Sequence, residues 1–263
     1  MKRGISQEGL KLLACVTMLI DHIGYAVISP MYQQISVLDN QMIGTAKLLY
    51  TVYLFLRCIG RLSLPIFAFL LVEGFHHTKN RKKYAIRLLI GTILSEIPYN
   101  LVVSGSPVWH YKQSIMITLF LGFLALLAME RCRKPAWKSV VMIPFAIVSE
   151  LLHADYGWGG VVLIALFELT RTMYNCNLIR FCGMVVLFHY IPSMMLQFGN
   201  FAVPMQALGA LSMLFIAAYD GRKISHNKTV QWAFYLFYPV HLAVLYGISI
   251  LHQTVQIGIS IVT

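Results

Sequence analysis

The chain has 263 residues, of which 58% are apolar and only 12% are charged. Soluble proteins carry about twice that share of charged residues, and a soluble core could not bury so much apolar surface. The composition therefore excludes an ordinary soluble domain and indicates an integral membrane protein. Because the five cysteines form no CxxC pair, we expect neither a zinc site nor a disulfide framework.

Apolar runs of about 20 residues, the length that crosses a bilayer as a helix, recur along the whole chain. We predict an all-α polytopic transmembrane bundle of about nine spans, with eight to ten as the range, in a single integral membrane domain over residues 1–263. In chain order the spans cover 10–29, 48–74, 85–103, 114–130, 139–153, 158–170, 180–198, 204–219 and 229–250. Segments 139–153 and 158–170 are short. They either tilt through a thin part of the bundle or form a re-entrant pair around residues 153–157.

Basic residues are distributed unevenly over the predicted loops. With the N-terminus inside, most lysines and arginines lie in cytoplasmic segments, whereas the outside loops hold only Lys47 and Lys112. Cytoplasmic loops of membrane proteins carry such an excess. We therefore predict a cytoplasmic N-terminus and a bacterial cytoplasmic membrane. The net charge of +11 then reflects topology and contact with anionic membrane lipids, and we expect no nucleic-acid partner.

Several ionisable side chains lie inside or beside the predicted spans, where a charge costs about 2.5–3.5 kcal/mol by insertion scales. Such residues are functional candidates by default. In chain order they are Lys11, Asp21, His22, Arg57, Arg61, Glu96, Glu150, His153, Asp155 and His241. The alternative is structural. The arginines and carboxylates would form ion pairs that fix helix register, the lysine would reach the membrane rim, and the last histidine would be a satisfied core residue.

Helical geometry relates some of these residues. Lys11 and His22 are eleven residues apart, so at about 100° per residue they share one helix face, roughly 16 Å apart along the axis. Arg57 and Arg61 are four residues apart and also share a face. Asp21 points about 100° away from His22, which favours a carboxylate from another span as the partner of the imidazole.

Eight stretches, in order and over nearly the whole chain, resemble the TraX family. They are residues 10–24, 57–69, 72–75, 77–80, 84–87, 95–98, 155–157 and 234–241. One difference is Asp220, where the family usually has asparagine between tyrosine and glycine. The family is associated with N-terminal acetylation of conjugative pilin at the inner membrane. It is also similar to the wider group of multi-span membrane acyltransferases, whose spacing of a basic residue and a histidine is matched by Lys11 and His22.

The resemblance implies an enzyme that moves an acetyl group from cytosolic acetyl-CoA to an acceptor at or beyond the membrane. Acetyl-CoA would be a co-substrate, with no tightly bound cofactor and no metal. The acceptor would be a protein amine, as in pilin, or a hydroxyl or amine of a cell-envelope glycan or lipid. His22 would be the general base, and Asp21 or Glu96 would fix its tautomer.

The remaining candidates are assigned to binding. Lys11 would hold the phosphates of the donor. Arg57 or Arg61 would also serve the donor side, by stabilising the oxyanion or by pairing with a carboxylate. The candidates for the acceptor side are Asp155, Tyr156 and His241.

Two other functions remain open. A proton-coupled transporter would also use buried acids, histidines and arginines, although the chain shows no convincing internal repeat of the kind many transporters have. Such a protein would take up substrate without an acyl donor. A non-catalytic partner in pilus or envelope assembly would keep its phenotype when His22 is replaced by alanine.

Overall fold

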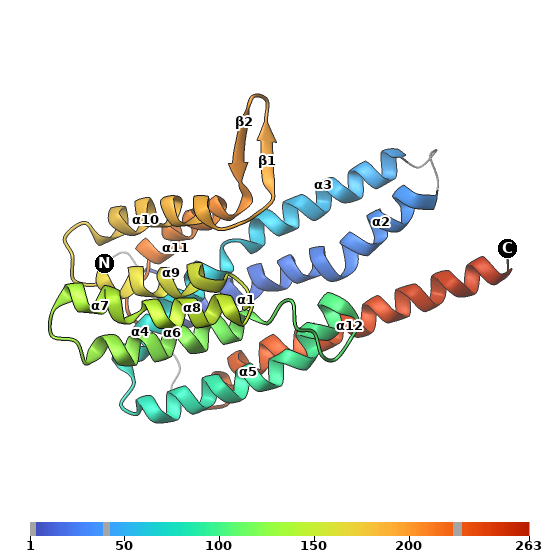
Figure 1. Ribbon diagram of the computed structural model, residues 1–263. Helices are drawn as coiled ribbons and strands as arrows, with labels where there is room; N and C mark the ends of the chain where they lie inside the picture. The colour runs from blue at the N-terminus through green and yellow to red at the C-terminus, as the bar shows by residue number, and fades with distance from the viewer. Residues whose placement is uncertain (1–3, 39–42, 223–227, 263) are drawn as a thin grey trace.

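The computed structural model describes residues 4–38, 43–222 and 228–262. Helices make up most of it and run roughly along one common axis (Figure 1). In chain order the elements are α1 (Gln7–Ile23), the π-helical turn η1 (Gly24–Ile28), α2 (Ser29–Leu38), α3 (Ile43–Gly60), α4 (Ser63–His77), α5 (Arg81–Ser104), α6 (Ile115–Glu130), α7 (Pro135–Val141), α8 (Ile143–Leu151), α9 (Gly157–Leu169), α10 (Cys176–Tyr190), β1 (Met195–Phe198), β2 (Phe201–Pro204), the 3₁₀ helix η3 (Met205–Ser212), α11 (Met213–Ala217) and α12 (Lys228–Val262). The predicted all-α class is confirmed, with one small hairpin added.

Four helices of the described chain are long and apolar enough to cross a bilayer, by length and composition. They are Gln7–Ile35, Gly44–His77, Arg81–Ser104 and Gln231–His252. Shorter apolar helices follow the third of them: Ile115–Glu130, Gly157–Leu169, Cys176–Tyr190 and Met205–Ala217. The chain therefore has the helices of a membrane protein. The predicted short segments 139–153 and 158–170 correspond to α7 with α8, and to α9.

Two of the long helices change geometry near candidate site residues. The first passes from α1 into the π turn η1 directly after His22 and Ile23, and such turns frequently occur at functional sites. The second is broken between α3 and α4, so that Arg61 and Leu62 lie in a turn. Both interruptions place ionisable side chains where the regular backbone pattern stops.

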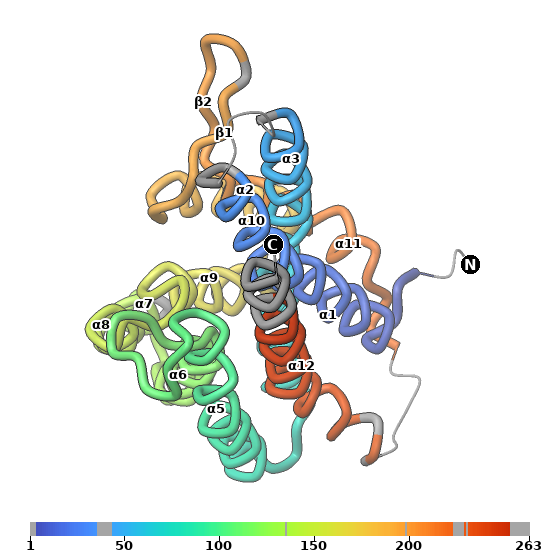
Figure 2. The backbone as a smooth tube through the Cα atoms, turned by 90° about the vertical axis from the view of Figure 1, so that its right-hand side faces the viewer, coloured from blue at the N-terminus to red at the C-terminus, as the bar shows by residue number. Residues whose placement is uncertain are grey.

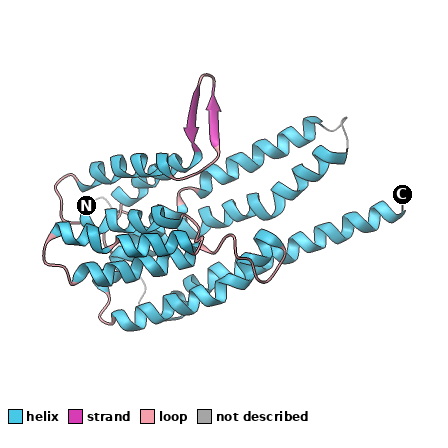
Figure 3. Cartoon of the chain, in the orientation of Figure 1, coloured by secondary structure: helices cyan, strands magenta, loops and turns pink. Residues whose placement is uncertain are grey.

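The predicted span 180–198 is too long, because α10 ends at Tyr190. Ile191 is extended, with φ −80° and ψ 123°, since the following Pro192 disfavours helical backbone before it. β1 then pairs antiparallel with β2, and Gly199, at φ 61°, supplies the positive φ that a tight hairpin turn requires. Figure 3 shows this hairpin standing out from the bundle, across the direction of the helices.

Helix α4 lies at the centre of the bundle. It packs against α1, α6, α9 and η3, and most of its residues from Leu64 to Val72 are buried. Outer helices keep exposed apolar side chains, such as Ile93 and Ile97 on α5 and Val244 on α12. Exposed apolar patches of this kind mark contact with a membrane or a partner.

Helix α1 lies between α3 and α12 and packs against both. The view along the bundle in Figure 2 shows α1 and α12 together near the middle, with α5 to α9 on one side. Helix α12 in turn packs along α5. Residues on α1 can therefore contact α3 from one face and α12 from another.

The connections α4–α5, α6–α7 and α9–α10 lie at the same end of the bundle as the described N-terminal segment (Figure 1). Ile5 pairs there with Tyr219. Beside it, Arg222 Nε donates to Asp220 Oδ2 at 2.6 Å, and this hydrogen bond holds the pKa of the carboxyl below its usual range. Arg222 Nη2 also donates to the carbonyl of Gly4 at 3.2 Å, so Asp220 helps to fix the start of the described chain.

Candidate functional site

A cluster of buried charges lies between α1 and α3. Asp21 accepts hydrogen bonds from Arg57 Nη1 and from Arg61 Nη2, one at each carboxylate oxygen. The three side chains are between 9% and 19% exposed. Gly60 makes room for this contact, because a Cβ at that position would lie 2.1 Å from Asp21 Oδ1. Two guanidinium groups thus share one carboxylate, and the cluster keeps a net positive charge.

Arg61 connects this cluster to two other parts of the chain. Its Nη1 donates to the hydroxyl of Tyr156 at 3.0 Å and to Oε1 of Gln206 at 3.3 Å. The Tyr156 hydroxyl donates to the same Gln206 oxygen at 3.1 Å. The Nε of Arg61 donates to the carbonyl of Arg57 at 3.1 Å. Arg57 instead lies over the ring of Tyr25, 5.5 Å from its centroid. The ion cluster therefore ties α1 and α3 to the turn before α9 and to η3.

The turn between α8 and α9 is strained where it presents Tyr156. His153 and Tyr156 have φ of 53° and 63°, in the left-handed region that non-glycine residues rarely adopt. Thr118 Oγ1 donates to the Asp155 carbonyl at 2.6 Å, and the Asp155 carboxylate pairs with Lys112 Nζ at 3.2 Å. Such strain persists only where the surroundings impose it, and it clusters at functional sites.

His22 meets His241 across the interface of α1 and α12. Its Nδ1 lies 2.6 Å from His241 Nε2, and the two ring planes are 14° apart. The ring of Tyr238 approaches both edge-on, with centroids 6.0 Å from His22 and 5.6 Å from His241. His241 Nδ1 lies 2.6 Å from the carbonyl oxygen of Phe237. Asp21 and His22 are adjacent, so α1 is fixed to α3 by one residue and to α12 by the next.

Two cavities approach this histidine pair from opposite ends of the bundle. The first, of about 790 Å³, includes Lys11 and Met18 of α1 and Tyr238 of α12. The second, of about 550 Å³, includes His22 of α1 and Leu242 of α12. Along α5 the first cavity is lined by Tyr84, Arg87 and Leu88, and the second by Tyr99, Val102 and Val103. Helices α1, α5 and α12 therefore each line the first cavity at one position and the second at another, with the histidine pair at the boundary between the two cavities.

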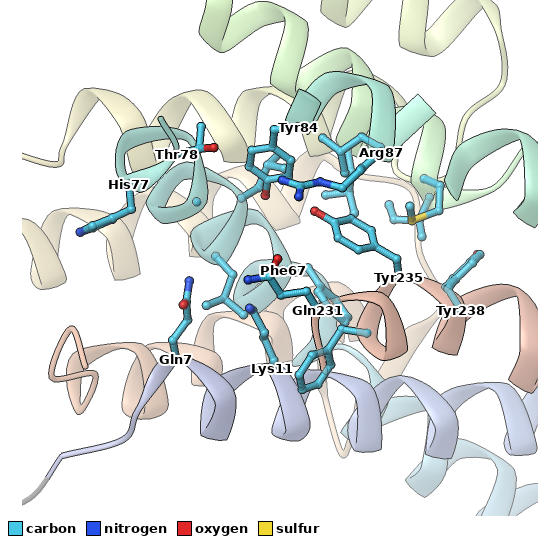
Figure 4. Close-up of a pocket in the computed structure, with 18 of the residues that line it drawn as sticks. Gln7, Lys11, Phe67, His77, Thr78, Tyr84, Arg87, Gln231, Tyr235 and Tyr238 are labelled. Atoms are coloured by element: carbon cyan, nitrogen blue, oxygen red, sulfur yellow. The ribbon is translucent and has the colours of Figure 1, made fainter. Parts of the chain in front are cut away.

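Basic and aromatic side chains form part of the lining of the first cavity. Figure 4 shows Lys11 reaching into it from α1, opposite Tyr84 and Arg87 of α5 and Tyr235 of α12. The Arg87 guanidinium lies 5.6 Å from the ring centroid of Tyr84 and 5.8 Å from that of Tyr235. Lys79, from the α4–α5 connection, adds another cation to the lining. These side chains suit an anionic ligand that carries a planar group.

The second cavity is more polar and rich in tyrosine. It contains the ion cluster and the strained turn, and its lining includes Tyr25, Tyr53, Tyr99, Tyr111, Tyr156 and Tyr190. Phenol groups offer both an apolar face and a hydroxyl that donates or accepts. This lining suits a polar molecule larger than water.

Most of the site residues predicted from the sequence lie in or beside these cavities. Lys11 lines the first cavity, whereas Arg57 and Arg61 line the second. The three residues predicted to bind the donor are therefore divided between the two cavities. The candidates that line the second cavity are Asp21, His22, Arg57, Arg61, Glu150, His153, Asp155 and Tyr156.

Glu96 and His241 take positions that the sequence did not indicate. Glu96 is not among the described residues that line either cavity, and its Oε1 accepts from Ser114 N and Oγ. His241, predicted on the acceptor side, occupies the place beside His22 where we expected a carboxylate. Sequence reasoning missed Gln206, which carries no signal of its own, and Tyr238, although it falls within the stretch 234–241.

An apolar helical bundle with a buried ion cluster, and with a histidine pair between two cavities, defines a membrane protein with a polar site among its helices. The family model described as TraX protein matches residues 6–249, and the chain belongs to this family, as its motifs predicted. It is 29% identical over 252 residues to a probable fimbrial assembly protein FimC, serogroup H1, of Dichelobacter nodosus, covering 90% of this chain and 92% of that protein. No solved structure matches the chain.

The packing of Asp21 against Gly60 can be tested by Gly60→Ala. The added Cβ would lie 2.1 Å from Asp21 Oδ1 and should displace the carboxylate from the arginines. Breaking a buried ion pair costs about 3–5 kcal/mol, so we expect a clearly lower thermal midpoint in detergent. Gly247→Ala is the control, because its Cβ would meet nothing within 4 Å in the described structure. Equal stability of the two variants would contradict the tight contact.

Proposed function

We propose that this protein is a membrane-embedded acyltransferase that moves an acetyl group from cytosolic acetyl-CoA to a membrane-associated or extracytoplasmic acceptor. The observation that carries the proposal is the pair of cavities that approach His22 and His241 from opposite ends. A transfer between a donor on one side of a membrane and an acceptor on the other needs two entrances and one reacting group at their boundary.

The first cavity fits the chemistry of coenzyme A. The phosphates need fixed cations, which Lys11, Lys79 and Arg87 supply. The rings of Tyr84 and Tyr235 offer faces for the adenine. The volume of about 790 Å³ lies within the range of small-molecule sites, about 300–1,000 Å³. The pantetheine arm would then follow α1 over the roughly 16 Å of helix rise from Lys11 to His22.

At the boundary His22 acts as the general base. It takes the proton from the acceptor hydroxyl or amine, and the acceptor oxygen or nitrogen attacks the thioester carbonyl carbon. The carbon–sulfur bond then breaks, and coenzyme A leaves as a thiolate that takes the proton back from the imidazolium. Arg57, with its share of the net positive charge of the ion cluster, stabilises the oxyanion formed between the two steps.

The acceptor enters through the second cavity, beside Asp155 and Tyr156. The name of the Dichelobacter nodosus relative refers to fimbrial assembly, which supports a pilin-like protein as the acceptor. A hydroxyl or amine of an envelope glycan or lipid also fits the tyrosine-rich lining. In either case the neutral hydroxyl or amine attacks the thioester while His22 takes its proton.

The orientation follows from the donor. Acetyl-CoA is cytosolic, so the first cavity and the basic connections at its end of the bundle face the cytoplasm. The N-terminus is then cytoplasmic. The four shorter apolar helices and the α7–α8 segment cross with the four long helices to give nine spans in the bacterial cytoplasmic membrane.

A second candidate function is a non-catalytic partner in pilus or fimbrial assembly, which the name of the relative favours directly. In that case the second cavity would bind a segment of a pilus subunit, and the histidine pair would only hold α1 against α12. This function requires no acyl donor, and the next experiment separates the two.

We expect purified wild-type protein to bind acetyl-CoA and to hydrolyse it slowly. His22→Ala should still bind acetyl-CoA but lose hydrolysis by at least about 100-fold, because general base catalysis contributes about 10²–10⁴-fold. Calorimetry measures the binding, and release of free thiol measures hydrolysis. His110→Ala, at an exposed loop position, is the control. Well-folded wild type that does not bind acetyl-CoA would overturn the proposal and favour the assembly partner.

The orientation can be tested by labelling single cysteines in a variant that lacks the five native ones. Lys47 and Lys82 are both exposed. Lys47 lies near the start of the second long helix, and Lys82 lies just after the connection that follows the end of this helix. A membrane-impermeant maleimide added to intact cells stripped of their outer membrane should label Lys47→Cys and not Lys82→Cys. Permeabilised cells should show labelling of both. The reverse pattern would contradict a cytoplasmic first cavity.

A further inference from the structure

We infer that His241 is a positioning residue that holds His22 in the tautomer whose Nε2 is unprotonated. The catalytic consequence rests on the proposed acyl transfer, whereas the tautomer itself follows from the geometry alone. No carboxylate among the described residues hydrogen-bonds to His22: Asp21 is taken up by the two arginines, and Glu96 accepts from Ser114.

A single backbone carbonyl determines the protonation of His241. The carbonyl oxygen of Phe237 can only accept a hydrogen bond, so His241 Nδ1, at 2.6 Å from it, carries a hydrogen. The contact lies within one turn of α12 and does not depend on another helix. The Phe237 ring stacks on the imidazole, with centroids 4.8 Å apart and planes 21° apart. His241 is only 7% exposed, so its ring has little freedom to turn over.

The protonation of His22 then follows from that of His241. A neutral imidazole has one N–H and one acceptor nitrogen, so His241 Nε2 accepts. Its partner at 2.6 Å is His22 Nδ1, which must donate, because two unprotonated nitrogens would direct their lone pairs at each other at that distance. The lone pair of a neutral His22 is therefore on Nε2. This is the less common tautomer of histidine in water.

The free nitrogen serves the second cavity. His22 Nδ1 is directed to α12, and among the cavity-lining residues His22 belongs to the second cavity only. Nε2 is thus the nitrogen that can receive the proton of an acceptor. When it does, the Nδ1 proton can shift to His241 Nε2, so that the pair holds one additional proton and both contacts remain. The proton returns by the reverse shift when the thiolate leaves.

Two substitutions of similar size separate this role from simple packing. In His241→Gln the side-chain amide reaches the position of the imidazole Nε2, and its oxygen can accept from His22 Nδ1. In His241→Asn the shorter amide reaches only the position of Nδ1. Both variants keep a polar group next to Phe237. The glutamine variant should preserve the tautomer of His22, and the asparagine variant should not.

The test is nitrogen NMR of protein labelled with ¹⁵N-histidine, with the His22 signals assigned by their loss in His22→Ala. Wild type and His241→Gln should show an unprotonated Nε2 and a protonated Nδ1 at His22. His241→Asn should show a larger share of protonated Nε2. Wild-type His22 with a protonated Nε2 as its main form would overturn the inference, whatever the protein does with acetyl-CoA.

Acetyl-CoA hydrolysis by the same three proteins supplies the second measurement. We expect His241→Asn to lose at least about tenfold in kcat, since loss of the correct histidine tautomer costs about 10⁴-fold in a serine protease. His241→Gln should recover most of that loss, and the Kd for acetyl-CoA should change little in either. Equal kcat in the two variants would overturn the positioning role. If the tautomers are as inferred but wild type binds no acetyl-CoA, the proposed function fails and the tautomer assignment stands.

Discussion

The shared carboxylate of Asp21 is the contact on which the rest of the site depends. Two arginines on one face of α3 and its following turn would repel each other at low dielectric without an anion between them. Gly60 leaves the space for that anion. With Asp21 fixed toward α3, the next residue must point about 100° around the helix, toward α12. The position of His22 is therefore a consequence of the ion cluster.

The same cluster gives the site its electrostatic character. One carboxylate between two guanidinium groups leaves a net positive charge beside the second cavity. This excess is local to the cluster, because Glu150 and Asp155 also line the cavity. A group that develops negative charge beside Arg57 would be stabilised by it. The strained turn that presents Tyr156 to Arg61 holds the guanidinium from another side and fixes its position in the site.

Local sequence features predicted much of this arrangement. Apolar length predicted the helices, and the spacing of Arg57 and Arg61 placed both on one face, where Asp21 now binds them. The spacing of Lys11 and His22 put them three turns apart, and they line two successive cavities. The 100° offset of Asp21 from His22 favoured a carboxylate of another helix as the partner of the imidazole, but the neighbour from another helix is a histidine, His241.

The sequence could not predict which distant segments of the chain contact each other. His22 and His241 are 219 residues apart, and helical spacing says nothing about which span faces which. Gln206 lies in a 3₁₀ helix inside a predicted α-helical span, so its approach to Arg61 had no periodic signal. The hairpin of β1 and β2 was hidden because its residues are as apolar as those of a span, and only Pro192 and Gly199 mark the change of backbone.

The proposed acyl transfer requires the donor to reach the histidine pair through the first cavity. A structure of the protein with a non-hydrolysable acetyl-CoA analogue, in which a methylene separates sulfur from carbonyl, tests it most directly. We expect the phosphates beside Lys11 and Arg87 and the carbonyl at the boundary next to His22. An analogue found in the second cavity, or with its carbonyl remote from His22, would contradict it.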